Sequence, residues 1–248
     1  MQLLDLLLEA VYIANVMSKG AGKSGKDDTK ERIMLAAESL FAERGFESVS
    51  LRDITTEALA NVAAVNYYFG TKDALIDELI TQGNAPLLSA RMKLLDAAEK
   101  KYQIGIVPVE VVLDAVMRPM LMQIEDHGDR RDIYCKFMGR CMTERGTNLP
   151  KPVILGAQRL IKRMIGLLTD ALPEDEPEVL IWKIHFSFGV LGHTLMHDEL
   201  LRSITKGASG EPDFEVTLQR MIDFCKGGLN AGSSEVALSS GNQGVFLF

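Results

Sequence analysis

The chain has 248 residues, 47% of them hydrophobic and 25% charged, which is an ordinary composition for a globular protein with a sizeable core. Its net charge of −7 argues against a protein that coats nucleic acid without sequence preference, because such a protein needs a broadly cationic surface. A sequence-specific DNA reader is compatible with this charge, since only its docking face must be cationic. No apolar run is long enough to cross a bilayer, and the N-terminus lacks a signal-peptide pattern. We therefore expect a cytoplasmic protein with no membrane partner.

Residues 1–27 are interpreted as an N-terminal extension that is flexible or partly helical. Leucines at helical spacing in residues 2–16 favour a short amphipathic helix, while Met17 is an alternative first residue. The glycine- and serine-rich stretch that follows is basic and is interpreted as a flexible tail. Its lysines are Lys19, Lys23 and Lys26.

The next segment predicts three short helices. The first begins at Asp28, which forms a capping box with Glu31, and it ends at Gly45. The second begins at the N-cap Ser50, and the third is capped by Asn61. A tight turn between the second and third helices is typical of a helix-turn-helix, in which the latter helix enters the major groove of DNA.

The rest of the chain is predicted to be helical, since apolar residues keep helical periodicity and strand-like alternation does not occur. Proline and glycine mark most boundaries, and Pro86 is expected to bend the first long helix. The predicted helices cover residues 72–101, 108–126, 131–144, 151–171, 177–204 and 212–227. We assign an all-α fold with a DNA-binding domain at 28–74, a helical domain at 75–229 and a disordered tail at 230–248.

The stretch from Ile33 to Leu75 carries a family resemblance. It contains LAAESLFAERGF, then SLRDIT, then NVAAVNYYFGTKDAL, and it resembles the N-terminal domain of the TetR family. The later segment WKIHFSFGVLGHTL is similar to one branch of that family. The resemblance implies an N-terminal three-helix helix-turn-helix domain and a C-terminal helical domain for ligand binding and dimerisation.

The resemblance also implies which residues face the DNA. Small apolar groups at the start of the third helix suit thymine methyls, and Asn66 can pair with an adenine edge. Hydroxyls and the amides at the next helix start suit phosphates. The expected DNA-binding residues are Ser50, Arg52, Asn61, Val62, Ala63, Ala64, Asn66, Tyr67, Tyr68, Thr71 and Lys72. The expected partner is a palindromic double-stranded operator.

One position departs from the family pattern. The turn of the helix-turn-helix usually holds a glycine, but this chain has Leu59 there, followed by Ala60. A non-glycine residue in the left-handed conformation costs about 1 kcal/mol. The sequence therefore leaves open a differently shaped turn and a different angle of the third helix.

The helical domain is expected to bind a small apolar effector, with a long acyl chain or its thioester as the expected class. Methionines and aromatic residues at 108–145 suit an adaptable pocket, although an ordinary helical core explains each of them equally well. Arg118 or Arg140 could hold a carboxylate, with a salt-bridged arginine as the alternative. The expected ligand-binding residues are Met117, Leu121, Phe137, Met138, Arg140, Trp182 and Phe186.

The last two predicted helices resemble the face through which the family forms homodimers as a four-helix bundle. Gly189 and Gly192 permit close helix approach. The expected interface residues are Gly189, Gly192, His193, Met196 and Met221. His193 and His197 are spaced for a metal, but no third ligand is obvious, so we expect neither metal nor cofactor.

The preferred function is a ligand-responsive repressor that an effector releases from its operator, rather than an enzyme. One alternative is a helical metallohydrolase using His185, His193 and His197, but the sequence offers no carboxylate cluster for that chemistry. The other is a protein-interaction module whose DNA-binding domain is a relic, because Leu59 has spoiled the turn. Buried free thiols are the interpretation of Cys135, Cys141 and Cys225.

Overall fold

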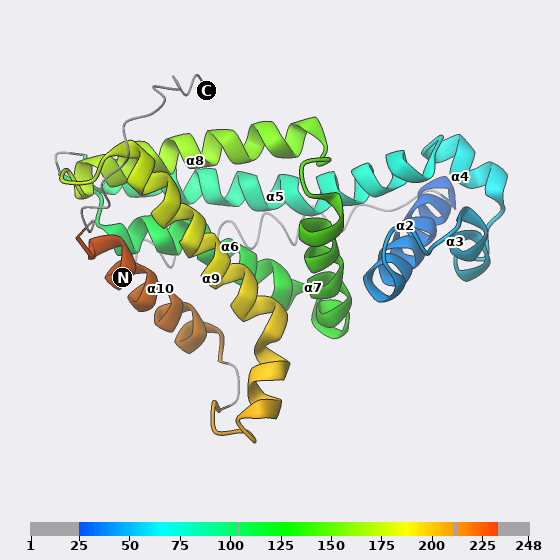
Figure 1. Ribbon diagram of the computed structural model, residues 1–248. Helices are drawn as coiled ribbons and strands as arrows, with labels where there is room; N and C mark the ends of the chain where they lie inside the picture. Colours follow the sequence, from blue (N-terminus) through cyan, green and yellow to red (C-terminus); the bar gives the residue numbers. More distant parts are fainter. Residues whose placement is uncertain (1–24, 104, 211–212, 233–248) are drawn as a thin grey trace, which may run out of the picture. The chain divides into compact units, whose positions relative to one another are not determined.

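The computed structural model describes residues 25–103, 105–210 and 213–232 (Figure 1). Within these ranges every regular element is a helix, which confirms the predicted all-α fold. The chain forms two compact units that divide between Leu79 and Ile80, inside α5 (Lys72–Lys101). The boundary expected after residue 74 lies in the same helix. The predicted helix at 2–16, two of the basic tail lysines (Lys19 and Lys23) and most of the C-terminal tail lie outside the described residues, whereas Lys26 belongs to the helix Gly25–Arg44.

The first unit contains α2 (Gly25–Arg44), α3 (Leu51–Glu57), α4 (Val62–Tyr68) and the start of α5. Its fully buried side chains come from all four helices and include Ile33, Phe41, Ile54, Val65 and Leu75. The predicted start at Asp28 is wrong, because α2 begins earlier and Asp28 accepts a hydrogen bond from Arg32 at 2.9 Å instead of capping the helix. The predicted end is confirmed: Gly45 has φ 81° and donates its N–H to Phe41 at 2.9 Å.

Both helices of the helix-turn-helix begin where the sequence predicts. The Ser50 hydroxyl accepts from the Asp53 N–H at 3.2 Å, and the Asp53 carboxylate accepts from the Ser50 N–H at 2.8 Å, which is a complete capping box. Hydrogen bonds from the side chain and backbone of Ser50 lower the pKa of Asp53. The Asn61 side chain accepts from the Ala64 N–H at 2.8 Å and caps α4. These caps fix the register of the exposed side chains on both helices.

Leu59 adopts the conformation that the sequence marks as costly. Its φ is 49°, in the left-handed region. The turn is a Schellman motif, in which Ala60 N–H donates to Thr55 O at 2.9 Å and Leu59 N–H donates to Thr56 O at 3.3 Å. The leucine thus keeps the turn that a glycine would make. Its side chain is 86% exposed, so burial does not offset the backbone cost of about 1 kcal/mol.

We expect Leu59→Gly to stabilise the protein by up to about 1 kcal/mol, because it removes left-handed strain without removing a packed side chain. Leu59→Ala is the matched control, since alanine keeps the strain and also removes the exposed side chain. Urea unfolding of both variants measures the difference. Equal free energies of unfolding for the two variants would contradict the assignment of strain to this position.

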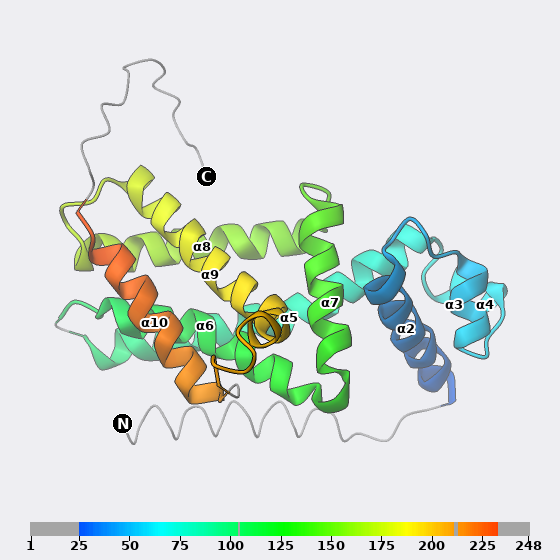
Figure 2. The same cartoon turned by 60° about the horizontal axis from the view of Figure 1, so that its bottom comes forward.

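The second unit contains the rest of α5, followed by α6 (Val109–Asp126), η1 (Gly128–Arg130), α7 (Arg131–Arg140), η2 (Cys141–Arg145), α8 (Lys151–Ala171), α9 (Pro177–Ile204) and α10 (Phe214–Asn230). These bounds agree closely with the predicted helices. α10 packs against α6 and α9, and α8 packs against α9 (Figure 1; Figure 2). The core of this unit therefore lies between helices from both ends of its sequence.

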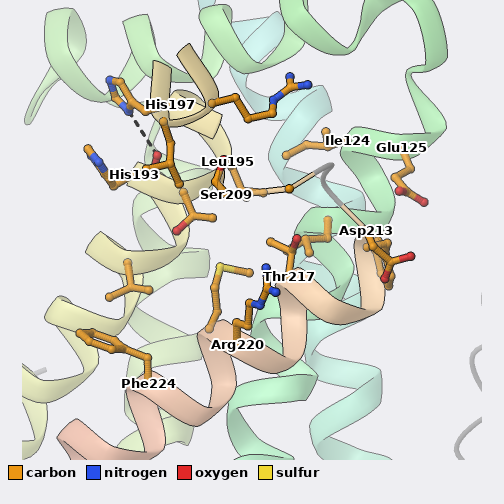
Figure 3. A pocket seen from close by; sticks show the side chains of 18 of the residues that line it. Ile124, Glu125, His193, Leu195, His197, Ser209, Asp213, Thr217, Arg220 and Phe224 are labelled. Atoms are coloured by element: carbon orange, nitrogen blue, oxygen red, sulfur yellow. Dashed lines mark hydrogen bonds between the residues drawn. The ribbon is translucent and has the colours of Figure 1, made fainter. Parts of the chain in front are cut away.

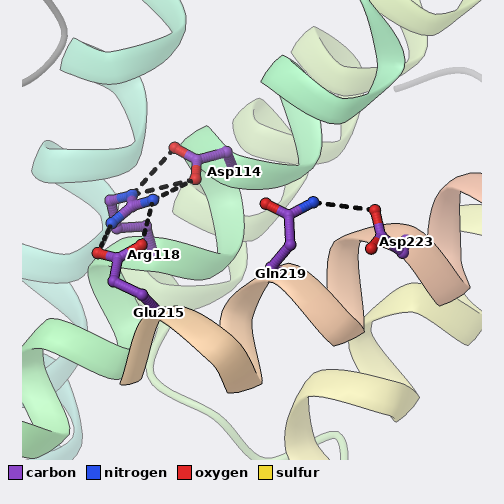
Figure 4. Close-up of polar contacts among 5 residues, drawn as sticks. All are labelled: Asp114, Arg118, Glu215, Gln219 and Asp223. Atoms are coloured by element: carbon purple, nitrogen blue, oxygen red, sulfur yellow. Dashed lines mark hydrogen bonds and ion pairs between the residues drawn. The ribbon is translucent and has the colours of Figure 1, made fainter. Parts of the chain in front are cut away.

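Arg118 of α6 joins this helix to α10 (Figure 4). Its guanidinium lies 2.8 Å from Asp114 and 2.6 Å from Glu215. Burial alone would lower the pKa of Arg118, but the hydrogen bonds with these two carboxylates outweigh it and raise the pKa. The predicted availability of Arg118 for an effector carboxylate is therefore not supported, because both sides of its guanidinium already hold acidic partners.

Candidate nucleic-acid interface and effector sites

The residues predicted to face DNA lie on one continuous segment, from the cap of α3 to the first residue of α5. Val65 is fully buried and anchors α4 to the core of the first unit. On the opposite side of α4, Tyr67 is 73% exposed and Val62 is 38% exposed. The other exposed residues of the predicted set are Ser50, Arg52, Asn61, Ala63, Asn66 and Thr71. α4 therefore presents small apolar groups, an amide and a phenol on one surface.

The adjacent tyrosines of α4 differ in their surroundings. The ring of Tyr68 is half-buried, 6.2 Å from Phe69, whereas Tyr67 projects outward with its ring 5.0 Å from that of Tyr68. Two neighbouring residues on a helix cannot share one face, so only one of the pair can pack inward. Tyr67 is the tyrosine whose hydroxyl is best placed to reach a phosphate.

Lys72 has a structural role that the sequence did not reveal. Its ammonium donates hydrogen bonds to the carbonyls of Phe46 at 2.8 Å and Val49 at 3.0 Å. The lysine thereby ties the start of α5 to the loop before α3. The predicted phosphate contact of Lys72 stays a prediction, because the two carbonyls take two of the three ammonium N–H donors and leave the positive charge in place. Thr71 likewise uses its hydroxyl to cap α5, accepting from the Ala74 N–H at 3.1 Å.

The cationic character of this face depends on Arg52. The guanidinium of Arg52 is exposed on α3 and has no ion-pair partner within the described part of the chain. Lys30 of α2 pairs with Glu78 at 3.1 Å. Each phosphate contact steepens the salt dependence of DNA affinity by about 0.9 in log K per log unit of salt, so a face with so few available cations predicts a shallow dependence.

The outer face of α9 is apolar and exposed. Trp182 is 55% exposed and Phe186 is 61% exposed, with ring centroids 5.9 Å apart. The predicted assignment of both residues to an effector pocket is therefore wrong, because four-residue spacing places them together on the surface while Leu180 and Ile184 point inward. Phe224 of α10 adds a further exposed ring, 70% accessible.

The predicted dimer residues divide between this face and the interior. Gly189 and His193 are exposed on α9, and a Cβ built on Gly189 would meet no atom within 4 Å. Gly192 and Met196 are half-buried, and Met221 is only 4% exposed. The assignment of Met221 to an interface is corrected, because its side chain faces the interior of its own protomer.

The expectation that no apolar run is long enough to cross a bilayer is wrong for α9, by length and composition alone. Its segment Pro177–His197 is the one described segment long and apolar enough to cross a bilayer, and 28% of it is buried. The inner side of α9 packs on α7, α8 and α10, as expected of a helix in a helical core. Its exposed aromatic side is a surface that a partner helix can cover.

The predicted effector residues on α6 and α7 are mostly packed core. Met117 and Phe137 are each 2% exposed, and Met138 is half-buried. Arg140 lies 2.6 Å from Glu144 one turn away, so its predicted role at a pocket mouth is corrected to a helix-surface ion pair. Leu121 is the member of the predicted set that lines the cavity described next.

A cavity of about 490 Å³ lies between α6, α9 and α10 (Figure 3). Its lining is mainly apolar, with Leu121 and Ile124 from α6, Leu195 from α9 and Met221 from α10. Arg220 contributes a guanidinium from α10. His193 and His197 border the cavity with stacked rings, 4.6 Å between centroids. The described residues contain no group of three or more histidine, cysteine, aspartate or glutamate side chains that could hold a metal.

Sequence reasoning missed Arg91. This half-buried residue of α5 lies on the same helix face as Leu87, Leu94 and Leu95, each no more than 4% exposed. Burial lowers the pKa of Arg91 to about 10, with a small opposing effect from Tyr134. The sequence does contain a signal for this residue: Arg91 lies three or four residues from leucines on both sides, so it falls within the apolar stripe of the helix.

Comparison with known proteins points to one family. A model described as "Bacterial regulatory proteins, tetR family" matches residues 33–79, and one described as "Tetracyclin repressor-like, C-terminal domain" matches residues 114–228. Together they cover well over half of the chain. Among curated proteins, the probable HTH-type transcriptional regulator YttP of Bacillus subtilis is 39% identical over 57 residues, which are 23% of this chain and 28% of that protein.

The HTH-type transcriptional repressor Rv3405c of Mycobacterium tuberculosis matches with the same identity over 57 residues, which are 23% of this chain and 30% of the repressor. The aligned segment thus spans less than a third of these relatives. Among solved structures, a TetR-family regulator from Bordetella parapertussis has a TM-score of 0.59 at 18% identity, covering 83% of this chain and 98% of that one. PfmR from Thermus thermophilus has a TM-score of 0.55 at 17% identity, covering 81% and 100%. These structural likenesses show a shared fold.

Proposed function

Because the chain belongs to the TetR family of bacterial regulatory proteins, we propose that it is a transcriptional regulator that binds double-stranded DNA as a homodimer. The observation that carries the proposal is the surface of α3 and α4. A capped helix there exposes Asn66 and Tyr67 while Val65 holds it to the core. Arg52 on α3 supplies the charge that draws this surface to phosphates.

The proposed operator is palindromic, because a two-fold symmetric dimer presents the same α4 to each half-site. The two reading helices then enter successive major grooves about 34 Å apart. Within each half-site, Asn66 pairs with adenine and the methyl groups of Ala63 and Val62 contact thymine. Tyr67 positions the unit by donating its hydroxyl to a phosphate.

The proposed action is repression that a small apolar effector relieves in the cytoplasm. Support comes from the repressor name of one relative and from the methionine-rich second unit, where α6 and α7 carry adaptable side chains. The exposed face with Trp182, Phe186 and Gly189 is the proposed dimer contact. An enzymatic function is not favoured by any specific observation on the described residues.

Selection of bound duplexes from a random pool tests the DNA-binding proposal directly. We expect a palindromic motif, and failure to enrich any sequence would favour a protein-interaction module. On the selected site, Asn66→Ala should weaken binding by about 1–3 kcal/mol and relax preference at one base pair. Ser39→Ala on α2 is the control, because the Ser39 hydroxyl donates to the Leu35 carbonyl one turn away and Ser39 is not one of the predicted DNA-facing residues, so affinity and preference should be unchanged.

A further inference from the structure

Arg91 is a charged group placed against the apolar interior of the second unit. Its neighbours one turn away on α5 are Leu87, Leu94 and Leu95, all buried. Its ring neighbour is Phe188 of α9, with the guanidinium 5.6 Å from the ring centroid. These surroundings remove most of the hydration of the charge, which is why burial lowers the pKa of Arg91 to about 10. The group nonetheless stays protonated at neutral pH.

The guanidinium uses little of its hydrogen-bonding capacity. Its Nε–H donates to the carbonyl oxygen of Val116 on α6 at 2.8 Å. Within the described part of the chain no carboxylate pairs with it, in contrast to the acid-paired Arg118 and Arg140. An arginine has five N–H donors, and with Nε engaged the two terminal nitrogens remain as a fork for a planar anion.

Polar side chains from two further helices lie beside this charge. Tyr134 of α7 is near enough to influence the ionisation of Arg91. The Tyr134 hydroxyl accepts a hydrogen bond from Gln123 of α6 at 2.7 Å, and Gln123 also donates to the carbonyl of Gly83 at 2.9 Å. His127 stacks on the tyrosine ring with centroids 4.0 Å apart. The position of Tyr134 is therefore fixed by α5 and α6 together.

Holding such a charge in apolar surroundings costs free energy of desolvation unless another group or a ligand interacts with it. An ionised group held in apolar surroundings without an opposite charge loses hydration that no ion pair restores. A residue that served only to bond Val116 O would not need a full positive charge. Arg91 is half-buried rather than fully enclosed, and its two terminal nitrogens are not among the described buried side-chain atoms that lack a partner, so they have contact with solvent.

We propose that Arg91 binds the carboxylate of an otherwise apolar effector, with Tyr134 beside the same carboxylate. This inference rests on the proposed effector response and names the chemical class of the ligand. The hydrocarbon part would begin along the half-buried ring of Phe188, over which the guanidinium lies.

Calorimetric titration of the full chain, in the absence of DNA, tests the proposal. The probes are straight-chain carboxylates from butanoate to dodecanoate and the alcohols of matching length. We expect the wild-type protein to bind at least one acid about 10- to 100-fold more tightly than its alcohol, as a charge-assisted bidentate contact provides. The ratio of acid affinity to alcohol affinity is measured on one protein at a time, so a difference in stability between proteins does not change it.

Arg91→Met should abolish the preference for acid over alcohol, and Arg91→Lys should reduce it, because lysine keeps a charge but lacks the fork. We also expect Arg91→Met to raise the Tm by roughly 2–4 °C, since an apolar side chain suits this site better than an unpaired charge. Arg220→Gln is the matched control, because it removes an arginine from the cavity between α6, α9 and α10.

Three results would overturn the proposal: no acid binds the wild-type protein, acid and alcohol bind alike, or Arg91→Met keeps the preference. Loss of preference in Arg220→Gln alone would assign the carboxylate to the cavity instead. The titrations contain no DNA, so they separate this inference from the proposed DNA-binding function. A protein that binds acids through Arg91 but selects no duplex would support the inference about Arg91 and contradict the proposed DNA-binding function.

Discussion

Gly189→Leu is expected to convert the homodimer to monomers while leaving the protomer folded. A side chain at this position meets open space within its own chain, so it causes no internal clash. On the proposed dimer face it would separate helices that approach closely at a glycine. Overpacking of about 1–3 kcal/mol at each of two symmetry-related positions weakens association roughly 30-fold to more than 10,000-fold.

Sedimentation velocity over a range of concentrations measures the change in association. Gly166→Leu is the matched control, because Gly166 is also an exposed helical glycine with open space around a Cβ, but it lies on α8 rather than on α9. Both substitutions favour the helix to a similar degree. A wild-type dimer in both variants would show that this part of α9 is not the interface. Monomers in Gly189→Leu should also lose most operator affinity, because one reading unit then binds without its partner.

Helix positions were largely predictable because local chemistry determines them. Ser50 and Asn61 each offer a side-chain oxygen to free backbone N–H groups, and that preference acts within a few residues of sequence. Gly45 ends α2 for an equally local reason. The predicted start at Asp28 was wrong because a residue that can cap a helix can also form an ion pair within it, as Asp28 does with Arg32 one turn later.

At Leu59 the sequence predicts the free-energy cost of a left-handed leucine but not the shape that the turn adopts. The sequence identified a position where leucine would be strained, and left open whether the turn would change shape. The structure keeps the turn and accepts the strain, because the caps and the buried Val65 hold α3 and α4 on both sides. Tertiary packing therefore outweighs a local cost of about 1 kcal/mol.

Charged residues were the hardest to assign from sequence. Lys72, Arg118 and Arg140 all seemed available for ligands, yet each has partners within the protein. The partner of Arg118 on α10 lies 97 residues away, and such pairings are invisible to spacing arguments. Arg91 is the opposite case, since its position in a leucine stripe hid a guanidinium with no acidic partner among the described residues.

The sequence also could not show which side of α9 packs against the core. Trp182 and Phe186 share one side of the helix, while Leu180 and Ile184 share the other, and both sides are apolar. Periodicity cannot tell which apolar side faces the core when neither is polar. The aromatic side is exposed in the protomer, and that is why the two rings now belong to the proposed dimer face rather than to a pocket.

Operator DNA is expected to weaken effector binding by the same factor by which the effector weakens DNA binding. This reciprocity is a requirement of linkage for any two ligands that favour different states of one protein. α5 contributes residues to the first unit and, from Ile80 onward, to the second. A conformational change in one unit can therefore affect the other through this helix. The second unit also holds Arg91 on this same helix, where the proposed carboxylate would bind.

The factor should be about 10 to 100, or roughly 1.4 to 2.8 kcal/mol of coupling. An effector identified by mass spectrometry of co-purifying small molecules would be titrated by calorimetry into free dimer and into operator-bound dimer. A duplex with a scrambled half-site, present at the same concentration, controls for non-specific competition. Equal effector affinities in the free and operator-bound titrations would mean that the two sites are uncoupled. The second unit would then act as a dimerisation platform, and release from DNA would require a different signal.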